Sequence, residues 1–333
     1  MTRSFVQEPR SSLRSQQRAF TLVEMIVVMA IIGVLAAILI PTIRAAMVRA
    51  KVSAIAADLS NLDAALNQFK EKYQIYPPGW SNLDLTVPAN MNYLVRSIQK
   101  MWPRITRNEL ALFAEIVNHR GPHVPASELK FEMDAAEALV FWLGGFSEDP
   151  NRPFTGFGGP FSGGERNQDN AYFPWDSERL TETGQSVMYT ITLKNGNTYT
   201  FLARESDDEV AYGLKNDPFP VVLARDTSWP IAYFNSANYP NASYPPYVYG
   251  ATRVTGHAHP YQSDRKLVNG TDYEWINLNS YQLVSAGLDE DYGVDSRNGT
   301  IRLFKRYTSG VFFQAGDNDN ITNFSGGTLE DAQ

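Results

Sequence analysis

The hydrophobic pattern changes twice within the first 76 residues. Residues 1–19 show no apolar periodicity, whereas from Phe20 the chain is apolar in every direction, with no charged or polar side chain between Met25 and Ile40. After Pro41 the apolar residues recur at alternating spacings of four and three, which is typical of one face of a helix; they are Val48, Val52, Ile55, Leu59, Leu62, Leu66, Phe69 and Tyr73.

This pattern predicts one long helix over residues 20–76, of which 20–43 span a membrane. The 21 residues from Phe20 to Ile40 would form about 31 Å of helix, which matches a hydrocarbon core of about 30 Å. The amphipathic half should pack on a folded domain, and it ends before Pro77 and Pro78, which cannot continue a helix.

Glu24 and Pro41 interrupt the apolar run. A carboxylate inside a membrane is unfavourable unless it is paired, and the next basic residue on this helix is Arg44. A partner chain, or a new amino terminus made by cleavage before Phe20, would supply the missing cation. Pro41 removes one backbone hydrogen bond, so we expect a kink or local melting there.

Residues 1–19 are predicted to be a basic leader. They hold four arginines and one acid, Glu8, and therefore carry a net charge of +3. A secretory signal peptide and a plain single-span anchor are the alternatives. Signal cores run about 7 to 15 apolar residues, which is shorter than this segment, and a plain anchor leaves Glu24 unexplained. Basic residues flank the span on both sides, so charge does not fix its orientation.

Residues 77–333 are predicted to form an α+β head, with short helices first and an antiparallel sheet afterwards. Asn195 and Gly196 mark a hairpin turn between strands over 187–193 and 198–202. Glycine- and proline-rich residues 150–164 indicate an irregular surface loop. We expect helices over 91–101, 108–117 and 127–143, and further strands over 221–223, 231–234, 281–285, 301–304 and 311–313.

The composition excludes several classes of ligand and functional site. The net charge of −7 argues against binding to nucleic acids or to anionic lipid. The sequence has no cysteine, which excludes disulfides, thiolate nucleophiles and cysteine-based metal centres. No nucleophile elbow, phosphate-binding loop, zincin helix or dinucleotide-binding glycine pattern is present.

Two acidic, glycine-punctuated stretches lie near the carboxyl end, within residues 285–324. The first runs from Ala286 to Gly293 and the second from Gly316 to Phe324. Oxygen-rich loops without cysteine or histidine suit a hard cation such as calcium. Asp, Asn and Gly also simply form turns, so residue types alone leave both explanations open.

The run from Arg18 to Met25 resembles the cleavage and methylation signature of type IV pilins and type II secretion pseudopilins. The resemblance implies cleavage between Ala19 and Phe20, methylation of the new Phe20 amine, Glu24 as the fifth mature residue and Pro41 as the twenty-second. The family's usual residue before the cut is glycine, so Ala19 implies slower cleavage. The resemblance is strong over residues 18–43 and fair through Tyr76, and the middle of the chain shows almost none.

The resemblance also bears on the acidic loops. The major pseudopilin of type II secretion has a calcium loop that begins with a Ser-x-Gly-x-Asp element, matched here by residues 285–289, and closes with an acidic pair before an isoleucine. In this chain Asn320 directly precedes Ile321, and the gap between the elements is longer. The implied ligands are Asp289, Asp317 and Asp319, with the Leu288 carbonyl, Asp291 and Asn320 as further candidates. Such an ion would close the intervening loop in a head that has no disulfide.

The resemblance implies a pilin-like fold and a structural function without enzymatic activity. We expect a pseudopilin of a type II secretion system: a single-pass inner-membrane protein with a periplasmic head, processed by prepilin peptidase. It would assemble with other pseudopilin subunits, on an inner-membrane platform, into a filament that helps export folded proteins. The alternatives are a minor pilin of a type IV pilus and a membrane-anchored periplasmic enzyme.

Overall fold

The computed structural model describes residues 21–80, 85, 87–119, 131–162, 166, 168–206, 218–239, 247–248, 257–268, 272–293, 305–313 and 315–331. The chain divides into two compact units, Met1–Arg49 and Ala50–Gln333. The first consists of the leader and the apolar half of the long helix, and the second holds the amphipathic half and the head. The architecture is α+β, as the sequence predicts.

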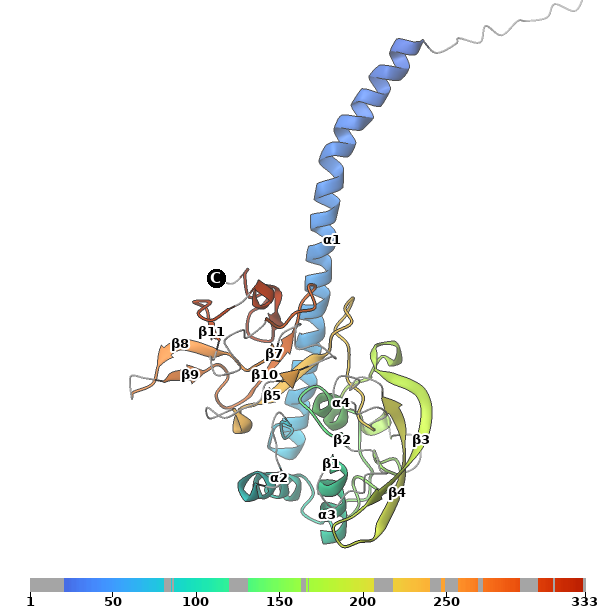
Figure 1. Cartoon of the computed structure of the whole chain (residues 1–333), viewed down its shortest axis with the longest axis vertical. Helices are drawn as coiled ribbons and strands as arrows, with labels where there is room; N and C mark the ends of the chain where they lie inside the picture. The colour runs from blue at the N-terminus through green and yellow to red at the C-terminus, as the bar shows by residue number, and fades with distance from the viewer. Residues whose placement is uncertain are drawn as a thin grey trace, which may run out of the picture. The chain divides into compact units, whose positions relative to one another are not determined.

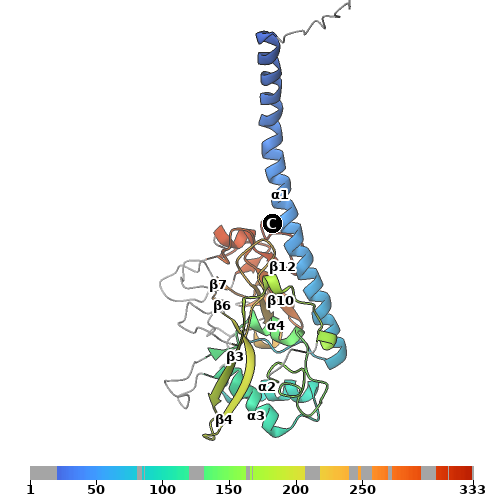
Figure 2. The same cartoon turned by 90° about the vertical axis from the view of Figure 1, so that its right-hand side faces the viewer.

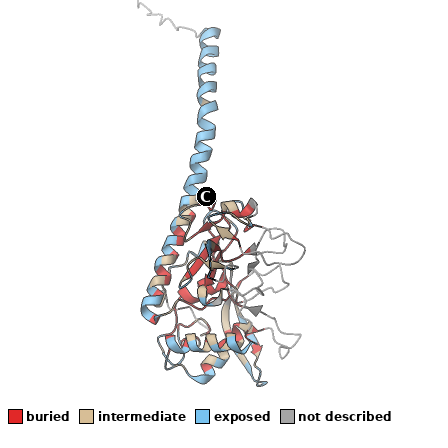
Figure 3. Ribbon diagram, turned by 90° about the vertical axis from the view of Figure 1, so that its left-hand side faces the viewer, coloured by how far each residue is buried: buried red, intermediate tan, exposed pale blue. Residues whose placement is uncertain are grey.

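Helix α1 runs from Leu22 to Tyr73 without interruption. Its first half exposes its apolar side chains, and its second half buries one face in the head (Figure 3). The predicted stripe is confirmed from Ile55 onward, because the buried face comprises Ile55, Asp58, Leu59, Leu62, Ala65, Leu66, Phe69 and Tyr73.

Asp58 corrects one detail of the predicted helix face. Its position off the apolar stripe predicts exposure, yet the residue is buried. The carboxylate is compensated by two arginines of the head: Arg179 Nη2 lies 2.9 Å from Oδ2, and Arg225 Nη2 lies 3.2 Å from Oδ1. A charged side chain can therefore lie on the buried face of the helix when oppositely charged side chains from distant segments pair with it.

Three short helices follow α1, and α2 and α3 lie near its carboxyl-terminal end (Figure 1). Thr106 begins α3, because its hydroxyl accepts a hydrogen bond from the Glu109 amide at 3.2 Å. The predictions over 91–101 and 108–117 are confirmed to within a few residues. The helices are α2 (Pro88–Met101), α3 (Arg107–Ile116) and α4 (Glu137–Leu143).

The helix predicted over 127–143 is wrong in its first half, as far as the structure describes it. Phe131–Glu132 form strand β2, paired with β1 (Asn118–His119). Helix α4 starts later because Asp134 Oδ1 accepts the Ala136 and Glu137 amides, while Glu137 Oε2 accepts the Asp134 amide at 2.6 Å. This reciprocal cap fixes the start of the helix, and Ser127 lies outside the described residues.

Residues 150–162 belong partly to the core and not only to the surface, which corrects the predicted loop. Phe154 and Phe161 are buried, and the Phe154 ring stacks on Phe113 of α3 with a centroid separation of 4.1 Å. The buried Glu109 carboxylate holds the loop, because Oε1 accepts the amides of Phe154 and Thr155, each at 2.8 Å. Aromatic burial thus fixes a segment whose glycines indicate irregular structure.

The hairpin around Asn195-Gly196 is confirmed. Strand β3 (Glu182–Thr192) pairs antiparallel with β4 (Thr198–Ser206), and Thr192 faces Thr198 next to the turn. Gly196 has φ +82°, a conformation that glycine adopts without steric strain. The two strands form a long curved ribbon (Figure 2).

The sheet that contacts α1 has the order β12–β10–β5 and is antiparallel. The Tyr281 hydroxyl of β10 donates to Asp63 Oδ1 of α1 at 2.5 Å. The strand predicted over 281–285 is confirmed with the same boundaries. The strands are β5 (Ile231–Asn235), β10 (Tyr281–Ser285) and β12 (Ile321–Thr322).

Two further small sheets complete the described head. One has the order β11–β8–β9 and contains a parallel pair, β11 with β8, within an otherwise antiparallel arrangement. Val222, Leu223 and Val311 form isolated bridges instead of the strands predicted over 221–223 and 311–313, and 301–304 lie outside the described residues. The strands are β6 (Tyr247–Val248), β7 (His257–Ala258), β8 (Gln262–Lys266), β9 (Tyr273–Trp275) and β11 (Arg306–Tyr307).

Candidate functional site

The amino-terminal half of α1 carries the candidate assembly site. This helix is long and apolar enough to cross a membrane. Large apolar side chains from Leu22 to Val48 are exposed, whereas soluble proteins rarely expose contiguous apolar surfaces of that extent. The segment therefore requires lipid or other helices around it.

Glu24 is satisfied locally in the described chain. Its Oε2 accepts hydrogen bonds from the Thr21 amide at 2.8 Å and the Thr21 hydroxyl at 2.9 Å, and its own amide donates to Thr21 Oγ1 at 3.2 Å. This is a capping box of the form Thr-x-x-Glu. The Thr-x-x-Glu spacing is visible in the sequence, although the acid within an apolar run draws attention to a charged partner instead.

No cation among the described residues pairs with the Glu24 carboxylate. Its two acceptor contacts both come from Thr21, which lies at the exposed start of α1. The carboxylate therefore remains accessible to a charged partner. Ala19 and Phe20, the residues of the expected cleavage site, lie outside the described residues.

Of the two outcomes expected at Pro41, a kink or local melting, the structure excludes melting. Helix α1 is continuous through it, and the neighbouring Thr42 hydroxyl donates to the Leu39 carbonyl at 2.8 Å and to the Ile38 carbonyl at 3.3 Å. Proline leaves the Ala37 carbonyl without its helical donor, and the Thr42 hydroxyl contacts the next two carbonyls of the same turn. Pro41 therefore lies within one unbroken α1.

The carboxyl-terminal candidates lie in two loops that the fold brings together. The first follows β10, and the second is the 3-10 turn Ala315–Asp319. Asp319 Oδ2 accepts the amides of Leu288 and Asp289, the latter at 3.0 Å. A side chain on Gly287, which has φ +71°, would collide with the Asp319 backbone and carboxylate. The two elements therefore lie next to each other through direct hydrogen bonds.

The acidic side chains are used as acceptors of backbone amides. Asp289 Oδ1 accepts the Asp291 amide and Asp291 Oδ1 accepts the Gly293 amide, at 3.0 and 2.9 Å. Burial, together with the negative charges of Asp319 and Asp291, raises the pKa of the Asp289 carboxyl to about 6. These contacts are those of turn-forming residues.

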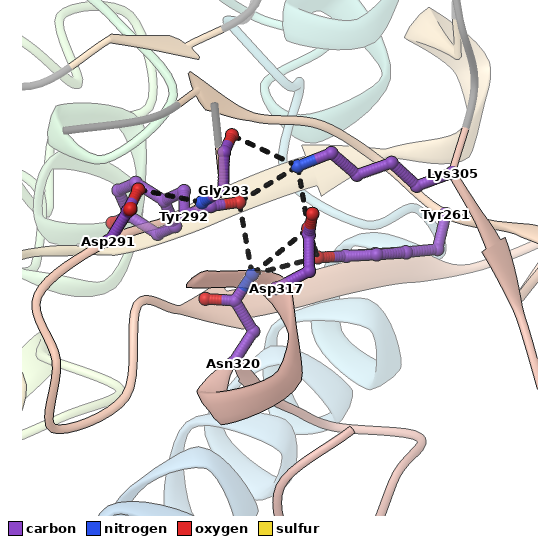
Figure 4. A network of polar contacts seen from close by, with 7 residues as sticks. All are labelled: Tyr261, Asp291, Tyr292, Gly293, Lys305, Asp317 and Asn320. Carbon is purple, nitrogen blue, oxygen red and sulfur yellow. Dashed lines mark hydrogen bonds and ion pairs between the residues drawn. The ribbon is translucent and has the colours of Figure 1, made fainter. Parts of the chain in front are cut away.

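A lysine occupies the centre of this region (Figure 4). Lys305 Nζ lies 2.6 Å from Asp317 Oδ1, and it donates to the carbonyls of Tyr292 at 2.9 Å and Gly293 at 3.2 Å. Both charged side chains are buried, with side-chain exposures of 2% for Lys305 and 0% for Asp317. The ammonium therefore has an acceptor for each of its three protons.

Tyr261 and Asn320 complete the polar network. The Tyr261 hydroxyl donates to Asp317 Oδ1 at 3.0 Å, and Asn320 Nδ2 donates to the Tyr261 hydroxyl at 2.9 Å and to the Tyr292 carbonyl at 3.2 Å. Burial raises the pKa of the Tyr261 hydroxyl well above its usual value, and the Asp317 charge adds to this effect. The phenol therefore stays a proton donor to the carboxylate.

The expected calcium ligands do not fit that ion as they are arranged here. Within the described ranges, no group of three or more acidic or histidine side chains could hold a metal. Asp317 faces Lys305, and Asp319 caps two amides. Asn320 Oδ1 is buried without a hydrogen-bond partner, but one such oxygen falls well short of the 6 to 8 that calcium takes. Calcium binding therefore stays a prediction.

Sequence reasoning missed Lys305 and Tyr261. Lys305 follows the mixed segment Ile301-Arg302-Leu303-Phe304 and has no acidic neighbour within four positions, so no local pattern marks it as buried. Its acceptors lie 12 and 13 residues away along the chain. A single lysine between two acidic loops is the signal that could have drawn attention to it.

A cavity of about 500 Å³ in the head bears on the enzyme alternative. Its lining includes Arg166, whose Nη2 donates to the Phe141 and Gly145 carbonyls at 2.6 and 3.0 Å. Burial lowers the pKa of Arg166 to about 10. Glu137, also in the lining, caps α4 through Oε2. These two side chains therefore hold backbone groups of the segment around α4.

Comparison with known proteins addresses the amino terminus. Residues 14–40 match the prokaryotic N-terminal methylation motif. The chain is also 36% identical over 74 residues to type II secretion system core protein G of Pseudomonas aeruginosa, an alignment that covers 22% of this chain and 52% of that protein. The chain thus spans about half the length of this relative. No solved structure matches the chain.

Proposed function

We propose that this chain, which is pilin-like by its methylation motif and by its similarity to a pseudopilin, is a structural subunit of a type II secretion pseudopilus. The proposal depends on the position of Glu24, near the start of an exposed apolar helix that begins just after the expected cleavage site. In this account prepilin peptidase removes residues 1–19, and the Phe20 amine becomes the methylated amino terminus.

Assembly follows from two physical requirements of α1. The apolar side chains from Leu22 to Val48 are exposed, so leaving the lipid for a filament is favourable only if other helices cover them. Glu24 must meanwhile keep a partner in an apolar environment. Side-by-side packing of subunits satisfies both requirements when Glu24 of one subunit meets the Phe20 amine of a neighbour.

The capping box gives Glu24 an interim partner before assembly. Thr21 supplies two hydrogen bonds to the carboxylate within the same chain, which reduces the penalty of holding an acid at the start of an apolar segment. A neighbouring ammonium group offers a stronger, charge-assisted contact. Because a slip by one helical turn would leave both charges unpaired, this contact would also set the register between subunits.

The head would lie in the periplasm, and the inner-membrane assembly platform would extract the processed subunit from the bilayer. In this account the filament helps to export folded proteins, and the chain itself has no enzymatic activity. The support is the N-terminal motif and the pseudopilin relative, together with the apolar helix.

Replacement of Glu24 tests the proposal. Glu24→Gln removes the charge while keeping the length of the side chain, so the protein should still insert and lose its leader but should not enter filaments. Thr21→Ala removes the capping hydroxyl and keeps the charge, and should assemble. Glu71→Gln, at an exposed position of the same helix, is the matched control. Sedimentation of sheared filaments and cross-linking in cells measure assembly, and normal assembly of Glu24→Gln would refute the proposed contact.

The size of the head favours a second candidate, a minor pilin of a type IV pilus. The same 74 residues make up 52% of the relative but only 22% of this chain, so this chain is more than twice as long. A large head suits a subunit present in few copies, such as a minor pilin. Counting copies per filament, and deleting the chain while scoring secretion and pilus formation separately, distinguishes the two candidates.

A further inference from the structure

Lys305 is a buried cation at the point where the two acidic loops meet. It lies among the Tyr292 and Gly293 carbonyls of the first loop and the Asp317 carboxylate of the second (Figure 4). A buried ammonium is unfavourable without compensation. Here all three protons are accepted and one acceptor is a carboxylate, so the group is compensated in full.

The geometry around Asp317 is built for this contact. A side chain at Gly293, which has φ +85°, would collide with the Asp317 carboxylate. Asp317 therefore packs directly against the backbone whose carbonyls hold the ammonium. Tyr261 donates to the same oxygen that Lys305 contacts, at 3.0 Å. Lys305, which directly precedes β11, thus links the loop after β10 to Asp317 of the 3-10 turn. The Tyr261 hydroxyl supports the same Asp317 oxygen.

We propose that the Lys305 ammonium takes the place of a divalent metal in this head, so that the carboxyl-terminal loops close without calcium. A metal held between the loops would sit beside a fixed positive charge, and that repulsion disfavours its binding. Lys305 already compensates Asp317, the acid nearest to it. This inference goes beyond the proposed function and does not depend on it, because it concerns how the head folds.

The contact also explains how a head without cysteine closes its last segment. Lys305 and Asp317 are 12 residues apart, and their pairing fixes the start of the turn Ala315–Asp319. The chain end then packs on that turn, where the Leu329 amide donates to the Asn320 carbonyl at 2.9 Å. Loss of the ammonium would therefore release both the loops and the carboxyl terminus.

The first test measures the wild-type protein. The full chain is purified in detergent, and thermal unfolding is followed by tryptophan fluorescence in 5 mM EGTA and in added calcium chloride from about 10 μM to 5 mM, a range that covers the affinities of weak extracellular calcium modules. We expect the same Tm at every calcium concentration. A rise of several degrees that saturates with calcium would overturn the proposal.

The second test removes the cation. Lys305→Met keeps the length of the side chain but removes the positive charge that compensates the buried Asp317 carboxylate, so we expect Tm to fall by more than about 5 °C. Lys194→Met, at the exposed hairpin tip, is the control and should not change Tm. An unchanged Tm for Lys305→Met would contradict the proposal. If that variant does not fold, the calcium titration of the wild type still decides the question.

Discussion

The Asp58 carboxylate of α1 and the Arg179 guanidinium of the head form an ion pair of 2.9 Å, with side-chain exposures of 8% and 18%. Arg179 is itself oriented by the Leu223 carbonyl, which accepts from its Nε and Nη2 at 3.0 and 2.8 Å. The pair therefore joins the amphipathic half of the helix to the bridge region around Val222 and Leu223.

Asp58→Asn should destabilise the head strongly, because it removes the buried carboxylate that compensates Arg179, whose side chain is only 18% exposed. Loss of one member of a buried pair typically costs about 3–5 kcal/mol. Arg225 contacts the same carboxylate but is half exposed, so Arg225→Gln should cost less than about 1 kcal/mol. Urea unfolding of the full chain in detergent measures both, and equal losses would contradict this assignment.

Tyr281→Phe should lower stability at pH 7 by about 1.5–3 kcal/mol, because it removes a hydrogen bond to a carboxylate. Burial raises the pKa of the Tyr281 hydroxyl, and its hydrogen bond to Asp63 raises it further. Above a pH of about 10, the usual tyrosine pKa, the unfolded chain loses this proton while the folded chain keeps it, so stability falls as pH rises. The phenylalanine variant lacks this titration.

The difference in unfolding free energy between Tyr281→Phe and the wild type should therefore shrink between pH 9 and pH 11.5. Other buried tyrosines titrate equally in both proteins and cancel in the comparison. A constant difference across this range would show that Tyr281 ionises alike in the folded and unfolded chains.

Glu109→Ala should release the loop over residues 150–162. The substitution leaves the amides of Phe154 and Thr155 without their acceptor, at a cost of about 1–3 kcal/mol for each buried group. Hydrogen exchange at these two amides should accelerate. Glu115→Ala is the control, because among the described residues Glu115 accepts the exposed Lys194 amide, at 2.7 Å, and no amide of this loop. Equal protection in both variants would argue against the role of Glu109.

Ala19→Gly should speed removal of the leader. The methylation motif spans the expected cleavage site, and the resemblance to pilins implies glycine before the cut. A pulse-chase assay with prepilin peptidase should show a larger cleaved fraction at early times for the variant. Equal or slower cleavage would indicate that the peptidase for this chain does not distinguish the two residues.

Elements governed by local pattern could be predicted from the sequence. The stripe from Ile55 to Tyr73 follows helical periodicity, and the hairpin follows from the backbone preference of Asn195 and Gly196. Glu24 was identified because a charge in an apolar run is conspicuous. Its contact with Thr21 follows from the Thr-x-x-Glu spacing, which is a second and purely local signal.

Features that depend on distant partners could not be predicted. Asp58 is buried only because Arg179 and Arg225 reach it from the head. Lys305 is buried only because two loops fold around it, and the first half of the expected helix over 127–143 is replaced by strand β2, which pairs with residues far from the local pattern. In each case tertiary contacts outweigh local propensity.

The central claim is that processing creates a charged terminus for Glu24 to meet. The most direct measurement is the amino-terminal sequence and intact mass of the protein isolated from its native membranes. The account predicts a chain that begins at an N-methylated Phe20. A chain that begins at Met1, with an unmodified mass, would contradict it.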